Sequence, residues 1–290
     1  NVFEIAQKQA DSEPDAFQLA QRYNDHLNRL RSINDIDLPI QTVPSQANID
    51  DAIDIFDRVN SQGTKLTDAV DRYVDNLVDN AEYSLRGLDF VLDCANGAAY
   101  QAAPLLFEKL GAAVEIHAAV PDGLNINAGC GATQPQYVAG LVKGRVGLAF
   151  DGDADRLIAV DENGAVANGD VLMAVFAKHL KDTGKLRNNT VVSTVMANLG
   201  FRRSMERLGI DVEETAVGDR YVYEGMRRVK AALGGEQSGH IIFYRGATGD
   251  GLRTAVRLAE VMAATGKPLT ELRKVITEYP QVLHNIEVAD

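Results

Sequence analysis

The sequence of 290 residues has no tryptophan and only two cysteines, Cys94 and Cys130. Two cysteines cannot build a disulfide framework or, without nearby histidines, a zinc site, so we expect buried thiols in a reducing cytoplasm. No apolar run is long enough to span a membrane, and the first residues lack the basic start and apolar core of a secretory signal. These absences exclude a disulfide-stapled secreted domain and a membrane protein, and they predict a cytoplasmic location.

Positive charge is also scarce. The chain has 29 Lys and Arg against 41 Asp and Glu, which gives a net charge of −12. This balance argues against a nucleic-acid-binding surface, because the DNA or RNA backbone is itself negative. Hydrophobic residues make up 46% of the chain, enough for ordinary cores, and its length exceeds one typical domain. We therefore expect two or three globular domains and neither a nucleic-acid nor a membrane partner.

An acidic loop between two short apolar runs is the most informative segment. The runs Gly147 to Phe150 and Leu157 to Val160 are too short for helices and apolar enough to be buried strands. Between them stand Asp151, Asp153 and Asp155. Alternate side chains of an extended segment point the same way, so the three carboxylates should converge. Mutual repulsion would raise their pKa values unless a hard cation bound them, and oxygen ligands suit Mg²⁺ or Ca²⁺.

Two other interpretations of this loop stay open from the residues alone. The three aspartates and Glu162 fall where an EF-hand loop places its ligands, but Arg156 replaces the turn glycine which that loop requires. A solvated acidic turn would show the same spacing, because Asp is common in turns. Arg156 adds a fixed positive charge that suits a phosphate group.

The segment FDGDADR, residues 150 to 156, resembles the metal-binding loop of the α-D-phosphohexomutases, and its surroundings are most similar to the bacterial phosphoglucosamine mutases. Five further blocks match in family order across about residues 69 to 290: LDCANGAAY (92–100), PDGLNINAGCGAT (121–133), TAVGDRYV (215–222), GGEQSGHIIF (234–243) and TGDG (248–251). The resemblance implies the second and third domains of a four-domain enzyme, over 69–165 and 166–281. It also implies that 282–290 begins a link to a missing fourth domain.

The resemblance implies an isomerase of amino-sugar metabolism, on the way to cell-wall precursors. In that family Mg²⁺ and an enzyme phosphoserine convert glucosamine 6-phosphate into glucosamine 1-phosphate through a 1,6-bisphosphate. The resemblance also implies a phosphorylated hexosamine as substrate and leaves a homodimer open. It assigns metal binding to Asp151, Asp153 and Asp155, catalysis to Arg156, Arg220 and His240, and substrate binding to Gly218, Gly235, Glu236 and Ser238.

Without the resemblance, the residues do not decide whether the Gly235–His240 turn and the Gly218–Arg220 segment bind a ligand. The polar turn from Gly235 to His240 has ordinary turn composition, although a carboxylate and a hydroxyl two residues apart suit adjacent sugar hydroxyls. Gly218 and Arg220 open a predicted helix, where free N–H groups favour an anion, but Arg220 could equally pair with Asp219. The other histidines show no acidic partner at a recognisable spacing, so we expect structural or exposed roles for His26, His117, His179 and His284.

Alternating strand and helix patterns predict two consecutive α/β domains of similar plan, each with a sheet between helices, after a mainly helical N-terminal segment. A ligand site is expected at the carboxyl ends of the strands. Thr133 with Pro135 should begin a helix by N-cap rules. The other predicted helices cover 15–31, 49–59, 69–80, 104–110, 170–180, 199–208, 219–231 and 250–264, and the predicted strands cover 38–43, 90–92, 114–117, 146–150, 157–160, 190–194, 212–215 and 241–244.

The first 68 residues have a different resemblance. IDDAIDIFDRVNSQGTKLTDA, residues 49 to 69, is similar to part of the ParB-like nuclease domain of GmrSD-type restriction enzymes, without that family's DGQQR-type catalytic motif. The TASHNP-like loop that carries the mutase phosphoserine is also absent from the 290 residues, and the chain opens on Asn1. We therefore expect a fragment or fusion, joined near residues 67–71, that is inactive as a mutase by itself. The alternatives are a noncatalytic chimera and a DNA-processing protein.

Overall fold

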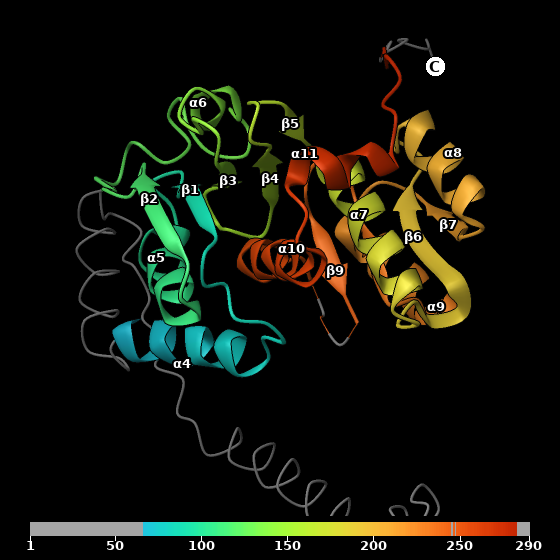
Figure 1. Cartoon of the computed structure of the whole chain (residues 1–290), viewed down its shortest axis with the longest axis horizontal. Helices are drawn as coiled ribbons and strands as arrows, with labels where there is room; N and C mark the ends of the chain where they lie inside the picture. Colours follow the sequence, from blue (N-terminus) through green and yellow to red (C-terminus); the bar gives the residue numbers. More distant parts are fainter. Residues whose placement is uncertain (1–65, 245, 247, 283–290) are drawn as a thin grey trace, which may run out of the picture. The chain divides into compact units, whose positions relative to one another are not determined.

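The computed structural model describes residues 66–244, 246 and 248–282, all within one compact unit, Thr64–Asp290. The elements expected before residue 66, the ParB-like segment up to that point and most of the link 282–290 lie outside the described residues. Two mixed sheets, each flanked by helices, make up the described part (Figure 1). The prediction of two consecutive α/β domains is thereby confirmed.

The first domain is built on five strands in the order β2-β1-β3-β4-β5. β1 runs parallel to β2 and β3, whereas β4 is antiparallel to β3 and β5. Every residue of β3 and β4 is buried, as their apolar runs predict. The strands are β1 (Asp89–Asp93), β2 (Ala113–His117), β3 (Val146–Phe150), β4 (Leu157–Val160) and β5 (Val166–Ala167).

The helices of the first domain are α4 (Leu66–Asp79), α5 (Ala99–Leu110) and α6 (Gln136–Ala139). The prediction that α5 starts at Pro104 is wrong, because Pro104 lies inside the helix. Buried alanines before it pack in the core with Phe107, so tertiary packing outweighs the hydrogen bond that proline removes. The expected Thr133 cap is also wrong, since α6 begins after Pro135 without a side-chain cap.

The second domain repeats the plan with four strands in the order β7-β6-β8-β9. β6 is parallel to β7 and β8, and β9 is antiparallel to β8. The strands are β6 (Thr190–Thr194), β7 (Asp211–Thr215), β8 (Leu233–Gly235) and β9 (Ile241–Phe243). β8 was not predicted, because two of its three residues are glycines. A Cβ atom on Gly234 would lie 2.6 Å from the Met226 sulfur, so a larger residue there would displace side chains of the close helix.

Helices cover both faces of the second sheet. The apolar residues Val222 and Met226 of α9 pack with Val192 and Ile242 of the sheet, whereas α7 and α8 contribute to the larger core that includes Val191. The helices are α7 (Gly169–Asp182), η1 (Arg187–Asn189), α8 (Leu199–Leu208), α9 (Asp219–Val229), α10 (Gly251–Thr265), α11 (Leu269–Leu272) and η2 (Arg273–Val275).

One apolar core runs through both domains, and α10 joins them. This helix follows the second sheet in sequence, yet it contacts β3, β4 and α5 of the first domain as well as α7 (Figure 1). Cys94 and Cys130 are buried and unpaired, and burial raises the pKa of the Cys94 thiol to about 12. Among the described residues, no helix has both the length and the apolar character needed to cross a bilayer.

Candidate functional site

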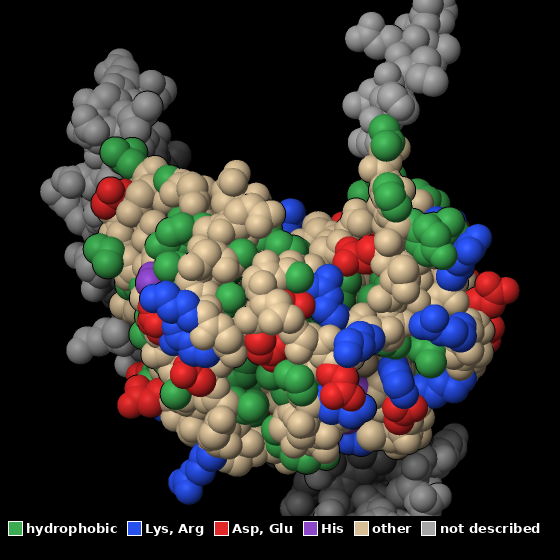
Figure 2. Space-filling model, turned by 45° about the horizontal axis from the view of Figure 1, so that its top comes forward, with side chains coloured by type: hydrophobic (Ala, Val, Ile, Leu, Met, Phe, Trp, Pro, Cys, Tyr) green, Lys and Arg blue, Asp and Glu red, His purple; other side chains and the backbone are tan. Residues whose placement is uncertain are grey.

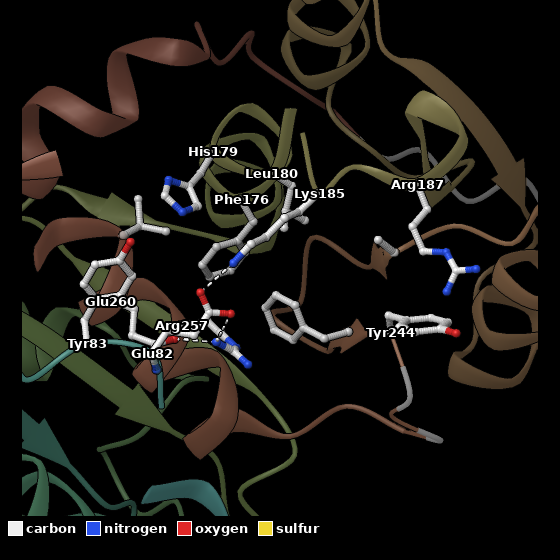
Figure 3. Close-up of a pocket in the computed structure, with 13 residues that line it drawn as sticks. Glu82, Tyr83, Phe176, His179, Leu180, Lys185, Arg187, Tyr244, Arg257 and Glu260 are labelled. Atoms are coloured by element: carbon white, nitrogen blue, oxygen red, sulfur yellow. Dashed lines mark hydrogen bonds and ion pairs between the residues drawn. The ribbon is translucent and has the colours of Figure 1, made fainter. Parts of the chain in front are cut away.

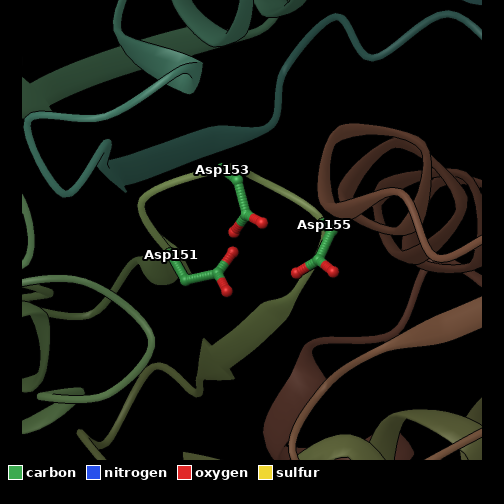
Figure 4. A group of neighbouring side chains, drawn as sticks. All are labelled: Asp151, Asp153 and Asp155. Atoms are coloured by element: carbon green, nitrogen blue, oxygen red, sulfur yellow. The ribbon is translucent and has the colours of Figure 1, made fainter. Parts of the chain in front are cut away.

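The acidic loop turns sharply between β3 and β4. The Ala154 N–H donates to the Asp151 carbonyl at 3.1 Å, and Ala154 adopts a left-handed φ of 62°. Asp151, Asp153 and Asp155 each place one carboxylate oxygen so that these atoms all lie within 4.8 Å of one another (Figure 4). The three side chains therefore converge as expected, but through this turn and not along an extended segment.

Asp151 is the most buried member of this trio, with 6% of the residue exposed. Burial raises the pKa of its carboxyl to about 6, and the charges of Asp155 and Asp153 raise it further. The Arg156 backbone N–H opposes this shift by donating to Asp151 Oδ1 at 3.2 Å. Without a counter-charge, keeping these carboxylates ionised side by side thus costs free energy.

The chemistry of these oxygens fits a hard divalent cation. Asp155 Oδ1 is buried and accepts no hydrogen bond. The Arg156 Nε atom lies 3.4 Å from Asp151 Oδ2 and 3.6 Å from Asp155 Oδ1, which compensates only part of the negative charge. Carboxylate oxygens at this spacing suit Mg²⁺ or Ca²⁺ better than zinc, which favours nitrogen and sulfur ligands. Asp151, Asp153 and Asp155 are the residues that would hold such an ion.

His240 links the acidic loop to the second domain. Its Nδ1 lies 3.0 Å from Asp155 Oδ2, and its Nε2 accepts the Gly249 N–H at 2.9 Å. A nitrogen that accepts a hydrogen bond carries no proton, so Nδ1 is the protonated nitrogen and donates to Asp155. Only 5% of His240 is exposed. The imidazole is therefore positioned to orient a carboxylate of the acidic loop.

Backbone contacts fasten the two loops together. Arg156 and His240 form an antiparallel bridge, and the Leu157 N–H donates to the Gly239 carbonyl at 3.1 Å. Gly239 has a φ of +94°, and a Cβ atom there would lie 2.3 Å from the Leu157 carbonyl oxygen. Such an approach requires glycine.

The turn from Glu236 to Ser238 is organised by its own hydrogen bonds. Glu236 Oε1 accepts the Gly218 N–H at 2.7 Å, and Ser238 Oγ lies 3.4 Å from Glu236 Oε2. Gly235 ends β8, and a Cβ atom on it would meet the His240 carbonyl oxygen at 2.7 Å. Gly218 thus brings the start of α9 to the Glu236 turn, as a shared site would need.

Arg220 stands apart from these contacts. Its Nε donates to Glu224 Oε1 at 2.9 Å, and its side chain is 80% exposed. The Asp219 carboxylate accepts the Arg220 backbone N–H at 2.7 Å, so the expected alternative, a side-chain pair with Asp219, is replaced by the pair with Glu224. A catalytic role for Arg220 stays a prediction.

Comparison with known proteins identifies the family. The family model for "Phosphoglucomutase/phosphomannomutase, alpha/beta/alpha domain II" matches residues 71–164, and the family model for domain III matches residues 168–279. The phosphoglucosamine mutase of Moorella thermoacetica is 50% identical over 230 residues, which cover 78% of this chain and 52% of that protein. That of Geobacillus kaustophilus is 51% identical over 223 residues, or 76% and 49% of the two chains.

The chain belongs to the phosphohexomutase family. The recognition of its domains II and III from sequence motifs is confirmed, and the first and second domains described above correspond to them. The chain spans about half the length of the curated relatives that it matches. The exact domain boundaries and the ParB-like resemblance of residues 1–68 stay predictions.

Solved phosphohexomutase structures share this fold. A phosphoglucomutase/phosphomannomutase family protein from Burkholderia thailandensis superimposes with a TM-score of 0.63 at 29% identity, over 74% of this chain and 47% of that one. The Aspergillus fumigatus N-acetylphosphoglucosamine mutase, in complex with GlcNAc-6P and magnesium, gives a TM-score of 0.62 at 20% identity, over 74% and 55% of the two chains. At that identity the second likeness concerns the fold alone.

The phosphohexomutase acidic loop also borders a hollow of about 620 Å³ that sequence reasoning did not anticipate. Asp153 and Asp155 line it together with Tyr73 of α4 and the start of α10. The Tyr73 hydroxyl donates to Asp250 Oδ1 at 2.7 Å, and the Gly251 N–H donates to the Ala154 carbonyl at 2.9 Å. The TGDG block (248–251) indicated a family motif at the start of α10, but its sequence alone did not predict these contacts.

The structure decides one alternative interpretation and corrects one expectation. Glu162 is no ligand of an EF-hand, because its carboxylate oxygens accept the backbone N–H groups of Leu269 and Thr270 at 2.8 Å each. His117 does have an acidic partner, since its Nε2 lies 2.7 Å from Glu115 Oε1. His117 and Glu115 lie on the edge strand β2, where alternate side chains share a face. His26 and His284 lie outside the described residues.

Proposed function

We propose that the described residues are the metal- and sugar-binding half of a phosphoglucosamine mutase-type phosphotransferase, which interconverts glucosamine 6-phosphate and glucosamine 1-phosphate through a 1,6-bisphosphate. The observation that carries this proposal is the junction of the two loops. Three converging carboxylates on one sheet and the Glu236 turn on the other are fastened by backbone hydrogen bonds. The bacterial relatives of about 50% identity favour the amino sugar.

Each residue of the site has a distinct proposed role. Asp151, Asp153 and Asp155 would hold Mg²⁺, which stabilises negative charge on a transferring phosphoryl group. Arg156, close to two of these carboxylates, adds a positive charge that can approach a phosphate. Glu236 and Ser238 offer a carboxylate and a hydroxyl to neighbouring sugar hydroxyls, and Gly218 and Gly235 allow the backbone to approach the ligand.

Metal binding is tested by titrating Mg²⁺ into the full chain and following the heat released. Asp153→Asn removes one carboxylate charge and should weaken Mg²⁺ binding at least about tenfold. Asp211→Asn, on the exposed start of β7, is the matched control and should leave affinity unchanged. Absence of Mg²⁺ binding by the unaltered chain would contradict the proposal.

Sugar binding and turnover need separate measurements. Saturation-transfer NMR should detect glucosamine 6-phosphate on the chain. Glu236→Gln should weaken that signal, whereas Glu271→Gln, which alters only an exposed pair with Lys267, should not. We also propose that the 290 residues have no mutase turnover, because they contain no TASHNP-like serine loop. Formation of glucosamine 1-phosphate by this chain would overturn that part.

A further inference from the structure

We infer that the second domain has another ligand site, which binds a phosphate ester attached to a planar ring, as in a nucleotide. The site is a hollow of about 490 Å³ formed by η1, the last turns of α9 and the end of β9, and we call it the basic hollow. It shares no residue with the acidic loop. The inference is independent of the mutase function proposed above.

Three cations line the basic hollow: Arg187, Arg227 and Lys230. Within the described part of the chain, none of them has a carboxylate partner, and no acidic residue lines the hollow. In a chain of net charge −12, cations usually have acids nearby. Figure 2 shows Lys and Arg side chains interspersed with Asp and Glu side chains over the visible face. An uncompensated group of three cations therefore predicts an anionic ligand.

A neighbouring hollow of about 260 Å³ makes the contrast clear (Figure 3). There Lys185 pairs with Glu82 at 2.5 Å, and Arg257 pairs with Glu260 at 2.7 Å. Carboxylates of the protein thus neutralise Lys185 and Arg257. Arg187, which lines both hollows, has no carboxylate partner among the described residues.

The cations are held in a way that leaves their donors available. The Arg187 guanidinium carbon lies 4.0 Å from the centre of the Tyr244 ring, and the two stack in Figure 3. The Arg227 guanidinium carbon lies 6.0 Å from the Tyr223 ring centre. Stacking occupies the face of a guanidinium but leaves its N–H groups free at the edge, where a phosphate can bind them two at a time.

The rest of the lining suits a planar apolar group. Met226 and Phe243 contribute thioether and aromatic surface beside the cations, and Met226 is almost fully buried. Aromatic and sulfur-containing side chains make favourable contacts with flat rings. A phosphate at the cations and a ring over this surface would use both parts of the hollow.

The helix dipole does not account for the cluster. Cations are favourable near the C-terminus of a helix, and Arg227 and Arg228 are in the last turn of α9. Arg187, however, belongs to η1, which is joined to the end of α9 by a 2.8 Å hydrogen bond from Asn188 Nδ2 to the Val229 carbonyl. Charges gathered from two elements around one hollow need another explanation.

Calorimetric titration of the full chain with adenosine 5′-monophosphate tests the inference, with inorganic phosphate and adenosine as comparison probes. The monophosphate should bind at least about tenfold more tightly than either part alone, because it engages cations and ring surface together. Arg187→Ala and Arg227→Ala should each weaken binding about tenfold through loss of a charge-assisted hydrogen bond. Arg228→Ala is the matched control, since Arg228 pairs with Glu213 and does not line the hollow.

Three results would overturn the inference. The first is monophosphate binding no tighter than that of phosphate, and the second is no binding at all. The third is equal loss of affinity in Arg228→Ala and Arg227→Ala. All three substituted arginines are exposed, and an unchanged melting temperature will show that the variants are folded. Retained binding in Asp153→Asn will separate this site from the acidic loop.

Discussion

The β3–β4 and β8–β9 hairpins occupy the same place in two similar sheets, yet they carry different chemistry. In each domain a strand parallel to the first is followed, across a short turn, by an antiparallel strand. The first turn gathers three carboxylates, and the second has Glu236, Ser238 and His240. The fold thus fixes where each turn lies, and the residues of the turn decide what it can bind.

The two turns also differ in how far the protein satisfies them. In the second, Glu236 accepts a backbone N–H and both nitrogens of His240 are hydrogen-bonded. In the first, Asp155 Oδ1 has no hydrogen-bond donor, and the pKa of Asp151 is raised. The protein thus satisfies the hydrogen bonds of Glu236 and His240 but leaves one carboxylate oxygen of Asp155 without a partner.

Separating the hairpins should have the largest effect. Gly239→Ala would press a Cβ atom against the Leu157 carbonyl, so we expect the free energy of unfolding to fall by about 3 kcal/mol or more. Gly266→Ala is the matched control, because Gly266 also has a positive φ but has no atom within 4 Å of a new Cβ. It should cost only about 1 kcal/mol. Urea unfolding will measure both, and equal losses would show that the hairpin contact contributes little.

Acid titration should distinguish a buried carboxyl of the acidic loop from one of the second domain. Burial raises the pKa values of Asp151 and Asp170 to about 6, above the unfolded value of 3.8. The folded protein therefore holds these protons more tightly than the unfolded chain. The stability they contribute is greatest below about pH 4 and falls as pH rises through 6, by about 3 kcal/mol for each.

Asp151→Asn and Asp170→Asn should each remove one share of this pH dependence. Saturating Mg²⁺ should cancel the share of Asp151, because the cation favours the ionised carboxylate, and leave that of Asp170 intact. Urea unfolding between pH 4 and 7, with and without Mg²⁺, gives the comparison. Loss of both shares on adding Mg²⁺ would contradict a metal site confined to the acidic loop.

Removing the His240 side chain, which links the two turns, should have the smallest effect. His240→Ala removes the donor to Asp155 and should weaken Mg²⁺ binding about tenfold, as is typical when a residue that orients a metal ligand is lost. His240→Asn keeps an N–H donor near the position of Nδ1 and should recover part of the affinity. Titration of Mg²⁺ into both variants measures this difference. Equal affinities would mean that the imidazole does not orient Asp155.

Local patterns predicted the elements whose chemistry lies within a few residues. The bounds of β3, β4, β6 and α8 agree with the apolar runs that predicted them. The start of α5 and the strand β8 were missed, because buried alanines and glycines carry little local signal and depend on the neighbours packed against them.

The candidate site shows the same division. The expected convergence of the three aspartates is confirmed, but a sharp turn produces it and not an extended segment. The contact between Asp155 and His240 joins residues 85 positions apart. Motif resemblance placed His240 near the site but gave neither its tautomer nor its partner. The uncompensated cations of the basic hollow come from separate elements and become visible only when the chain is folded.

Cutting the chain between its two domains would not release two intact bodies. α10 comes late in the sequence but packs on β3, β4 and α5, so a fragment ending near residue 165 would expose the apolar surface that this helix covers. The separate halves should aggregate when expressed alone and recover solubility when expressed together. A division that suits sequence comparison is therefore a poor place to split the molecule.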